Sequence, residues 1–87
     1  RLVFARYDNT MPVIVEYDLQ QQAARTLALS GKEPAVSPRG PLRMAYTIGE
    51  APSEQVWLLD LESGDRRKIA DGASPGWSPD GTQLFFR

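Results

Sequence analysis

Few residues of this chain have types and spacings that suit chemistry. The 87 residues include no histidine and no cysteine, which excludes the commonest general base, a Ser-His-Asp triad and thiolate metal ligands for this chain. Ser30 and Lys32 have the residue types of a Ser-Lys pair, but a solvated loop lysine is the favoured interpretation. We therefore expect no catalytic residue and no enzyme activity from this chain.

Two groups of acidic residues have the chemistry for cation binding or proton transfer. They lack the Asp-x-Asp-x-Asp-Gly spacing of a calcium loop, and carboxylates in hairpins commonly cap turns or face water. Gly72, Gly76 and Gly81 do not open a helix, so no phosphate-binding loop is predicted. We expect no metal and no cofactor. The two acidic groups are Asp60, Glu62 and Asp65, and Asp8 with Glu16.

Ten basic and eleven acidic residues leave a net charge of −1, which argues against nucleic acid as a partner. Arg66, Arg67 and Lys68 form the one basic cluster. We expect this cluster on an outermost strand, where charged side chains protect a sheet edge from aggregation, with contact to an acidic partner as the alternative. The apolar runs are too short for a membrane span. Because the chain opens on a strand-like run, it is expected to be a piece of a larger protein.

Short β-strands are the elements that must position these residues. Seven prolines and seven glycines interrupt the chain too often for a helix with an apolar period of 3.6. Residues 20–25 lack an apolar stripe and are expected to form a loop. Val, Ile, Tyr, Phe and Trp concentrate in nine short runs, which is typical of an all-β fold. The runs are residues 2–6, 13–17, 25–29, 34–36, 43–48, 56–59, 66–69, 75–77 and 84–86.

Five segments recur in order at a period of about 41 residues. The motif around Asp18 returns around Asp60, 42 residues later, and the run Pro-Ala-Val-Ser-Pro at 34–38 returns as Pro-Gly-Trp-Ser-Pro at 75–79. A period of about 40 to 45 residues that carries four strands is the signature of β-propeller blades. These are small twisted sheets whose two apolar faces are buried by radial stacking. We predict an all-β fold of propeller-type, four-stranded antiparallel blades, with about two repeats of a larger array.

The predicted blades divide the chain into the end of one blade (1–33), a complete blade (34–69) and the start of the next (70–87). In the second repeat Pro79 sets φ at the turn, Asp80 bonds back to the backbone and Gly81 supplies a positive φ. Trp77 is expected to fill the space between neighbouring blades. These roles serve folding and imply no chemistry. The structural motif comprises Trp77, Ser78, Pro79, Asp80 and Gly81, and in the first repeat Ser37, Pro38 and Gly40.

The segment 75–86, Pro-Gly-Trp-Ser-Pro-Asp-Gly-Thr-Gln-Leu-Phe-Phe, resembles the repeat of TolB-type β-propellers, in which a Trp-Ser-Pro-Asp-Gly turn precedes an apolar-x-aromatic strand. Segments 56–64 and 66–69 resemble the strands that follow in that family. In the first repeat Val36 stands at the tryptophan position, Arg39 at the aspartate, and Gln22 at the glycine that matches Gly64. The resemblance implies a non-catalytic, periplasmic scaffold of the bacterial cell envelope that binds other proteins.

Two other functions stay open. Similar blades form the propeller that gates peptide substrates in prolyl-oligopeptidase-like serine peptidases, which requires a hydrolase domain with a G-x-S-x-G motif downstream. They also form the sensory propeller of membrane-bound transcription regulators. Two blades leave sheet faces and edges uncovered, so further blades or self-association are expected. Loops on one face of the sheets are candidates for binding a partner. Their residues are Tyr7, Asp8, Asn9, Glu50, Ser53 and Glu54.

Overall fold

The computed structural model describes residues 2–8 and 10–87, without the side chains of Asp8 and Leu29. Nine β-strands follow one another in this part of the chain, and each overlaps one of the nine predicted runs. The loop expected over residues 20–25 is wrong in its second half, because a strand begins at Ala23 and pairs with its neighbour. The described residues contain no helix of the length and apolar character that a membrane span requires. The strands are β1 (Leu2–Asp8), β2 (Met11–Asp18), β3 (Ala23–Leu29), β4 (Gly31–Val36), β5 (Arg43–Ile48), β6 (Gln55–Asp60), β7 (Arg66–Asp71), β8 (Gly76–Trp77) and β9 (Leu84–Phe85).

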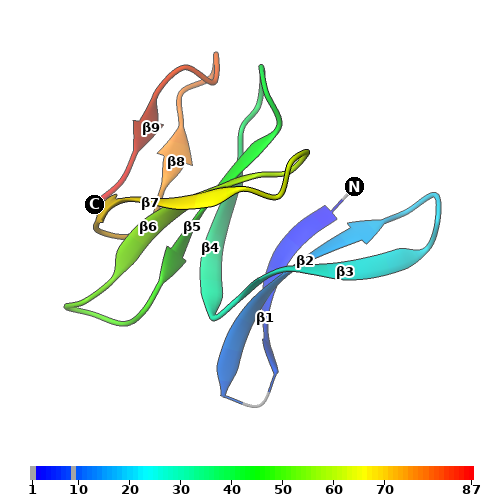
Figure 1. Ribbon diagram of the computed structural model, residues 1–87, viewed down its shortest axis with the longest axis horizontal. Coiled ribbons are helices and arrows are strands. Elements are labelled where there is room, and N and C mark those ends of the chain that lie inside the picture. The colour runs from blue at the N-terminus through cyan, green and yellow to red at the C-terminus, as the bar shows by residue number, and fades with distance from the viewer. Residues whose placement is uncertain (1, 9) are drawn as a thin grey trace.

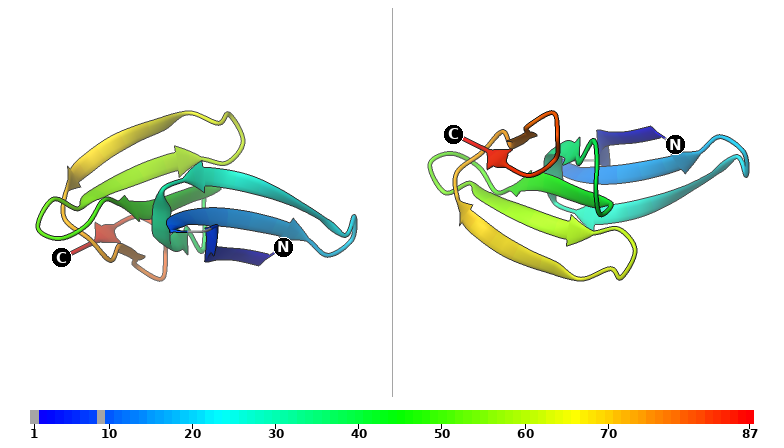
Figure 2. Two further views of the ribbon diagram at one scale, coloured as in Figure 1. Left: turned by 90° about the horizontal axis from the view of Figure 1, so that it is seen from below. Right: turned by 90° about the horizontal axis from the view of Figure 1, so that it is seen from above.

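The strands form three antiparallel sheets that meet at β4 (Figure 1). The first sheet contains β1, β2 and β3, the middle sheet contains β4 to β7 in that order, and the third pairs β8 with β9. As the edge strand of the middle sheet, β4 contacts β1 and β2 of the first sheet and β8 of the third. The strands on the outer side, β3 and β7, lie farther from each other than β4 lies from β1 and β2 (Figure 2). The sheets are therefore arranged like blades that converge on their inner strands.

The pairing register shows that the sequence repeat is also a structural repeat. Leu2 pairs with Tyr17 in the first sheet, and the residues 42 positions later, Met44 and Leu59, pair in the middle sheet. A register shift interrupts the β2–β3 pairing after Ile14, and the matching shift interrupts the β6–β7 pairing 42 positions later. The segments β1–β3 and β5–β7 therefore share their strand order, their register and their bulge.

The third sheet repeats the inner half of the middle sheet. Gly76 pairs with Phe85 as Ala35 pairs with Ala45. These two pairs are related by the same repeat, because each residue of the third sheet lies 40 or 41 positions after its counterpart. Strands β8 and β9 thus stand in the third sheet where β4 and β5 stand in the middle one.

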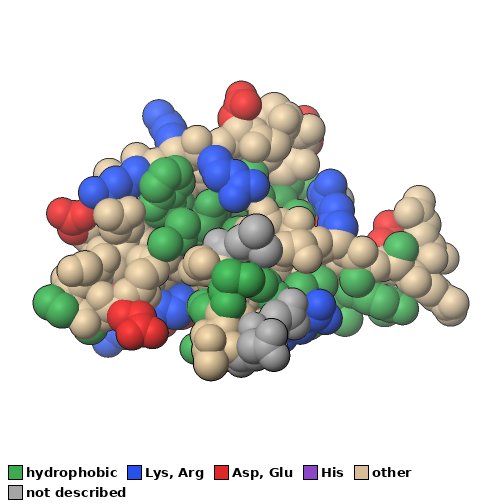
Figure 3. Space-filling model, turned by 60° about the horizontal axis from the view of Figure 1, so that its bottom comes forward, with side chains coloured by type: hydrophobic (Ala, Val, Ile, Leu, Met, Phe, Trp, Pro, Cys, Tyr) green, Lys and Arg blue, Asp and Glu red, His purple; other side chains and the backbone are tan. Residues whose placement is uncertain are grey.

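The hydrophobic core lies between the first and middle sheets. Tyr46 is completely buried there, whereas its counterparts Phe4 and Phe86 in the other sheets are 40% and 42% exposed. The middle sheet has a neighbour on both faces, and burial of apolar surface stabilises by roughly 25 cal/mol per Å². Large hydrophobic side chains of the first and third sheets are exposed, and Figure 3 shows hydrophobic side chains at several places on the surface. The core residues are Ile14, Leu27, Ala28, Met44, Tyr46 and Leu59.

Side-chain hydrogen bonds close the turn of the second repeat. The Ser78 hydroxyl donates to Asp80 Oδ1 at 2.7 Å and accepts a bond of 3.0 Å from the Gln83 amide. The Gly81 amide donates to the Ser78 carbonyl at 2.9 Å. Asp80 Oδ1 also accepts bonds from the amide and the hydroxyl of Thr82. The Ser78 bond and the two Thr82 bonds lower the pKa of Asp80 to about 2, so this carboxylate stays ionised well into acidic solution.

The first repeat keeps this turn with different residues. Ser37 Oγ accepts a bond of 3.1 Å from the Arg43 amide, as Ser78 Oγ does from the amide of Gln83, just before β9. Because the aspartate is absent, the Ser37 hydroxyl donates instead to the Pro41 carbonyl at 2.9 Å. Gly40 has a φ of 77°, the same value as its counterpart Gly81. The turn geometry therefore survives the loss of the aspartate side chain.

Trp77 joins the third sheet to the middle sheet. Its indole Nε1–H donates to the Ala35 carbonyl at 2.8 Å, and the Arg43 guanidinium lies 5.0 Å from the ring centroid. Arg43 Nη2 also donates to the Gly81 carbonyl at 3.3 Å. These contacts hold the half-buried ring against β4 and β5, where hydrogen-bonded indole groups contribute both packing and orientation.

Gly40 and Gly81 provide a matched test of how the two turns meet. A Cβ on Gly40 would meet nothing within 4 Å, whereas a Cβ on Gly81 would lie 2.7 Å from the Arg39 carbonyl oxygen. A positive φ costs an alanine about 1 kcal/mol, and the collision adds about 1–3 kcal/mol. Gly40→Ala should therefore lower the free energy of unfolding by about 1 kcal/mol and Gly81→Ala by about 2–4 kcal/mol. Chemical denaturation measures both, and equal losses would contradict the close approach of the turns.

Candidate functional site

Four connections between strands lie at the same end of the sheets. Because neighbouring strands are antiparallel, the connections β1–β2, β3–β4, β5–β6 and β7–β8 all fall at this end (Figure 1). We call it the connection face. The loops predicted to bind a partner belong to it, although Asn9 and the side chain of Asp8 lie outside the described residues. The predicted residues described at this face are Tyr7, Glu50, Ser53 and Glu54.

Glu54 forms an ion pair with Lys32 across the connection face. Lys32 Nζ lies 3.0 Å from Glu54 Oε2, and the two side chains are 27% and 22% exposed. The hydrogen bond to Glu54 raises the pKa of Lys32 above its ordinary value, with smaller contributions from Glu33 and the nearby Tyr7. Lys32 is therefore not the solvated loop lysine expected from the sequence. It stays protonated at neutral pH and is unsuited to act as a general base for Ser30.

Glu33 of the middle sheet holds Ser74, which lies just before the third sheet. The Ser74 hydroxyl donates to Glu33 Oε2 at 2.9 Å, and the Ser74 amide is shared between Glu33 Oε1 (3.3 Å) and Thr47 Oγ1 (3.2 Å). Arg87 Nη2 donates to Ser74 Oγ at 2.8 Å. Burial raises the pKa of Glu33, but the hydrogen bonds from Ser74 and Thr47 outweigh it and hold that pKa below its ordinary value. The Glu33 carboxylate thus joins two sheets near the start of their inner strands.

Glu33 and Ser74 occupy equivalent positions of the repeat, 41 residues apart. Both have a φ of 55°, a left-handed conformation that costs a residue with a side chain on the order of 1 kcal/mol. The pairing of β4 with β5 also shifts between Lys32 and Ala35. Because the same conformation occurs at both equivalent positions, it belongs to the repeat and not to one loop. It allows the side chain of one sheet to reach the backbone of the next.

A surface depression of about 520 Å³ opens beside this network. It presents carboxylates from Glu54 and Asp71 and the guanidinium of Arg87. A side chain on Gly72 would collide with the Arg87 carbonyl oxygen, so glycine allows these two chain segments to lie close together. The Gly72 amide donates to the Glu54 carbonyl, and the Ala73 and Arg87 amides donate to each other's carbonyls, so the depression offers charged side chains and not free backbone groups. The lining residues are Pro52, Glu54, Asp71, Gly72, Ala73 and Arg87.

The structure brings together few of the residues predicted for the connection face. Glu54 takes part in the ion pair, but Glu50 and Ser53 meet through their backbones alone, with a Ser53 N–H to Glu50 carbonyl distance of 2.7 Å. Tyr7 is 68% exposed. The sequence analysis missed the residues that make the central contacts here. These residues are Lys32, Glu33, Thr47, Ser74 and Arg87.

The acidic cluster near residue 60 caps a turn. Asp60 Oδ1 accepts hydrogen bonds from the amides of Glu62 (2.9 Å) and Ser63 (3.1 Å), and the Ser63 and Glu62 bonds lower the pKa of Asp60. Asp18 accepts the corresponding two bonds in the first sheet. Within residues 2–8 and 10–87, no three acidic side chains gather in a way that could hold a metal ion.

The chain is similar in fold to a solved structure described as the β-propeller domain of the Trilobed protease from Pyrococcus furiosus, with an open velcro topology. The similarity covers 97% of this chain with a TM-score of 0.76 and 22% sequence identity, and it spans 28% of the length of that chain. The predicted propeller fold of about two blades is thereby confirmed. No protein-family model and no curated protein matches the chain. The resemblance to TolB-type repeats stays a prediction.

Glu33→Gln tests the contact between the middle and third sheets. Because the folded pKa of Glu33 lies below its ordinary value of 4.5, its ionised form stabilises the fold above about pH 4.5, and this contribution is lost as the pH falls through the folded pKa. The protein should therefore be more stable than Glu33→Gln at pH 7, by less than about 1 kcal/mol because the side chain is largely exposed. The difference should shrink as the pH falls below the ordinary value of 4.5 and the carboxyl group becomes protonated. Urea denaturation at pH 7 and at a pH well below that value measures it.

Glu50→Gln is the matched control for this experiment. Glu50 lies on an exposed loop of the same face, and its side chain forms no hydrogen bond or ion pair among the described residues. We expect it to alter stability by the same small amount at both pH values. If Glu33→Gln had equal effects at neutral and acidic pH, the ionised Glu33 contact would not stabilise the fold.

Proposed function

We propose that this chain is part of a β-propeller that restricts access of substrates to the active site of an attached peptidase. The observation that carries the proposal is the similarity in fold, over 97% of the chain, to the propeller domain of a protease. The catalytic groups would lie outside this chain, because it contains no histidine or cysteine. Its one lysine on the connection face, Lys32, is held protonated by Glu54.

The geometry of the inner strands supports such a filter. Strands β4 and β8 are in contact, and near their beginnings Glu33 is hydrogen-bonded to Ser74. The ion pair of Lys32 with Glu54 lies beside this contact. In a closed ring of such sheets the inner strands surround a narrow passage, and these polar contacts would keep its rim rigid. An extended peptide would pass through the rim, whereas a folded domain would be excluded by its size.

A second candidate is a periplasmic scaffold that binds other proteins. It is supported by the turn at residues 77–81, whose sequence resembles the TolB-type repeat and whose side chains form the hydrogen bonds described above. In that function the connection face would be the binding surface. The exposed ring of Tyr7 and the charged depression beside Arg87 would contact the partner.

The parent protein distinguishes the two candidates. The gating proposal requires the same reading frame to encode a hydrolase domain with a G-x-S-x-G motif, and it expects the purified parent to cleave short peptides far faster than folded proteins. Glu33→Arg removes the bonds to Ser74 and adds a charge beside Lys32. It should raise kcat/KM for a folded substrate about fivefold and change that for a short peptide less than about twofold.

One outcome would contradict the gating proposal. A parent protein that lacks peptidase activity, yet retains a defined protein partner through affinity purification, would contradict the gating proposal and support the scaffold. The same Glu33→Arg variant then serves as a probe of the binding surface. In a scaffold, loss of the Glu33 contact to Ser74 should weaken the partner's binding.

A further inference from the structure

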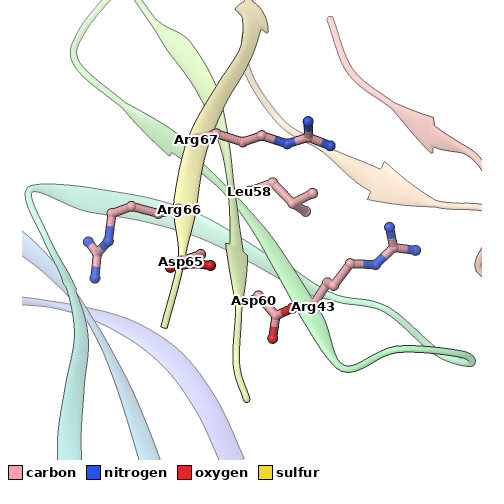
Figure 4. Close-up of a pocket in the computed structure, with 6 residues that line it drawn as sticks. All are labelled: Arg43, Leu58, Asp60, Asp65, Arg66 and Arg67. Carbon is pink, nitrogen blue, oxygen red and sulfur yellow. The ribbon is translucent and has the colours of Figure 1, made fainter. Parts of the chain in front are cut away.

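A separate pocket lies on the outer part of the middle sheet, away from the connection face. Its volume is about 250 Å³, and Figure 4 shows the residues that line it. Arg43, Leu58 and Arg67 come from three neighbouring strands, β5, β6 and β7, and point to the same side of the sheet. Arg66 points to the opposite side, where its Nη2 donates to the Leu27 carbonyl at 3.2 Å.

Two guanidinium groups in this pocket have donors that the described residues do not use. Arg43 Nε is buried and has no hydrogen-bond acceptor among them. Arg67 takes part in none of the ion pairs formed within the described part of the chain. A buried donor without an acceptor is unfavourable. The exposed Arg67 guanidinium is therefore available to an acceptor from outside, whereas Arg43 Nε is closed off and its guanidinium is held by Trp77 and the Gly81 carbonyl.

The first sheet shows which kind of group completes such a pocket. By the 42-residue repeat, Arg25 is the counterpart of Arg67, and Glu16 is the counterpart of Leu58. Glu16 Oε1 accepts a hydrogen bond of 2.7 Å from Arg25 Nε, and the Glu16 side chain is 8% exposed. In the middle sheet leucine replaces this glutamate, so the arginine is retained without the carboxylate that faces it in the first sheet.

Two aspartates limit the kind of ligand that this pocket can bind. Asp60 and Asp65 also line the pocket, but neither is ion-paired with its arginines within the described residues. Asp60 Oδ1 is engaged by the turn amides. The negative charge of the two aspartates disfavours a doubly charged phosphate, and Leu58 provides an apolar floor. A single carboxylate on an apolar stem satisfies both conditions.

We expect the pocket on the middle sheet to stay accessible to a ligand even if the third sheet has further outer strands. Its counterpart in the first sheet has a volume of about 310 Å³ and is lined by residues of that sheet alone, although the four-stranded middle sheet packs against the first sheet. Outer strands added to the third sheet in the corresponding place would leave the middle pocket accessible as well. The lining residues of the counterpart are Glu16, Asp18, Gln21, Ala23, Ala24 and Arg25.

We propose that the pocket formed by Arg43, Leu58 and Arg67 binds a glutamate or aspartate side chain of a polypeptide partner. The carboxylate accepts a hydrogen bond from the Arg67 guanidinium, in the position that the Glu16 carboxylate holds against Arg25 in the first sheet, and it lies beside the positive charge of Arg43. Its methylene stem packs on Leu58. The site lies apart from the connection face, so it does not depend on whether the propeller gates a peptidase or serves as a scaffold.

The test is a titration of the isotope-labelled protein with acetyl-Ala-Glu-Ala-amide, followed through the Nε–H signals of Arg43 and Arg67. Acetyl-Ala-Gln-Ala-amide is the neutral control. We expect the glutamate peptide to shift both signals and to bind at least about tenfold more tightly than the glutamine peptide. Equal binding of the two peptides, or no shift, would overturn the proposal. Acetate should bind more weakly, because it lacks the stem, and equal binding of acetate would overturn the assignment to a polypeptide.

Three variants separate a specific site from general charge attraction. Arg67→Gln should weaken the binding of the glutamate peptide about tenfold. Leu58→Glu supplies an internal carboxylate at the position of Glu16 and should abolish binding. Arg39→Gln removes the same charge from an exposed residue outside the pocket and should change the affinity less than about twofold. If Arg67→Gln and Arg39→Gln weakened binding equally, the attraction would come from net charge and the proposal would fail.

Discussion

A small sheet with two apolar faces is stable in water only when both faces are covered, and the rest of this structure depends on that constraint. The middle sheet satisfies it: Thr47 and Val56 on its strands are completely buried, as is Tyr46. The counterparts Phe4 and Phe86 are partly exposed because Phe4 lies on β1, the edge strand of a sheet without a described counterpart of β4, and Phe86 follows the two-stranded third sheet. Coverage of both faces brings neighbouring sheets together at their inner strands, and here strands of both neighbouring sheets contact β4. Such convergence is the physical basis of a propeller.

Polar contacts between the sheets determine how they are placed, while apolar burial supplies most of the stabilisation. Each is a bond from a side chain of one sheet to the backbone of the next: Trp77 to the Ala35 carbonyl, Arg66 to the Leu27 carbonyl, and Glu33 to the Ser74 amide. A buried backbone group that loses such a partner is costly, so these bonds favour one relative position of the sheets. The proposed gating function uses the last of these contacts, at the start of the inner strands, where the rim of a passage must be rigid.

The local structure was predictable from the sequence, whereas the polar contacts between the sheets were not. Alternating apolar residues and turn chemistry located all nine strands, and the 41-residue period located the repeat. Gln22 keeps a left-handed φ of 53° where the second repeat has Gly64, so the turn persisted although its signal had changed. The pairs Lys32–Glu54 and Glu33–Ser74 join residues 22 and 41 positions apart, and no pattern within one strand predicts them. The equivalent positions of Glu33 and Ser74 in the repeat could have predicted their contact, because equivalent residues of neighbouring blades meet near the inner strands.

Native-state amide hydrogen exchange tests most directly whether coverage on both faces governs stability. Amides of β5 that bond to β6 should exchange only through global unfolding, whereas the matching amides of β1 that bond to β2 should exchange through smaller local openings and therefore faster. Tyr46 and its counterpart Phe4 form the sharpest comparison, because the two residues share a register position and differ in burial, at 0% and 40% exposure. Equal protection of β1 and β5, or greater protection of β1, would contradict the account.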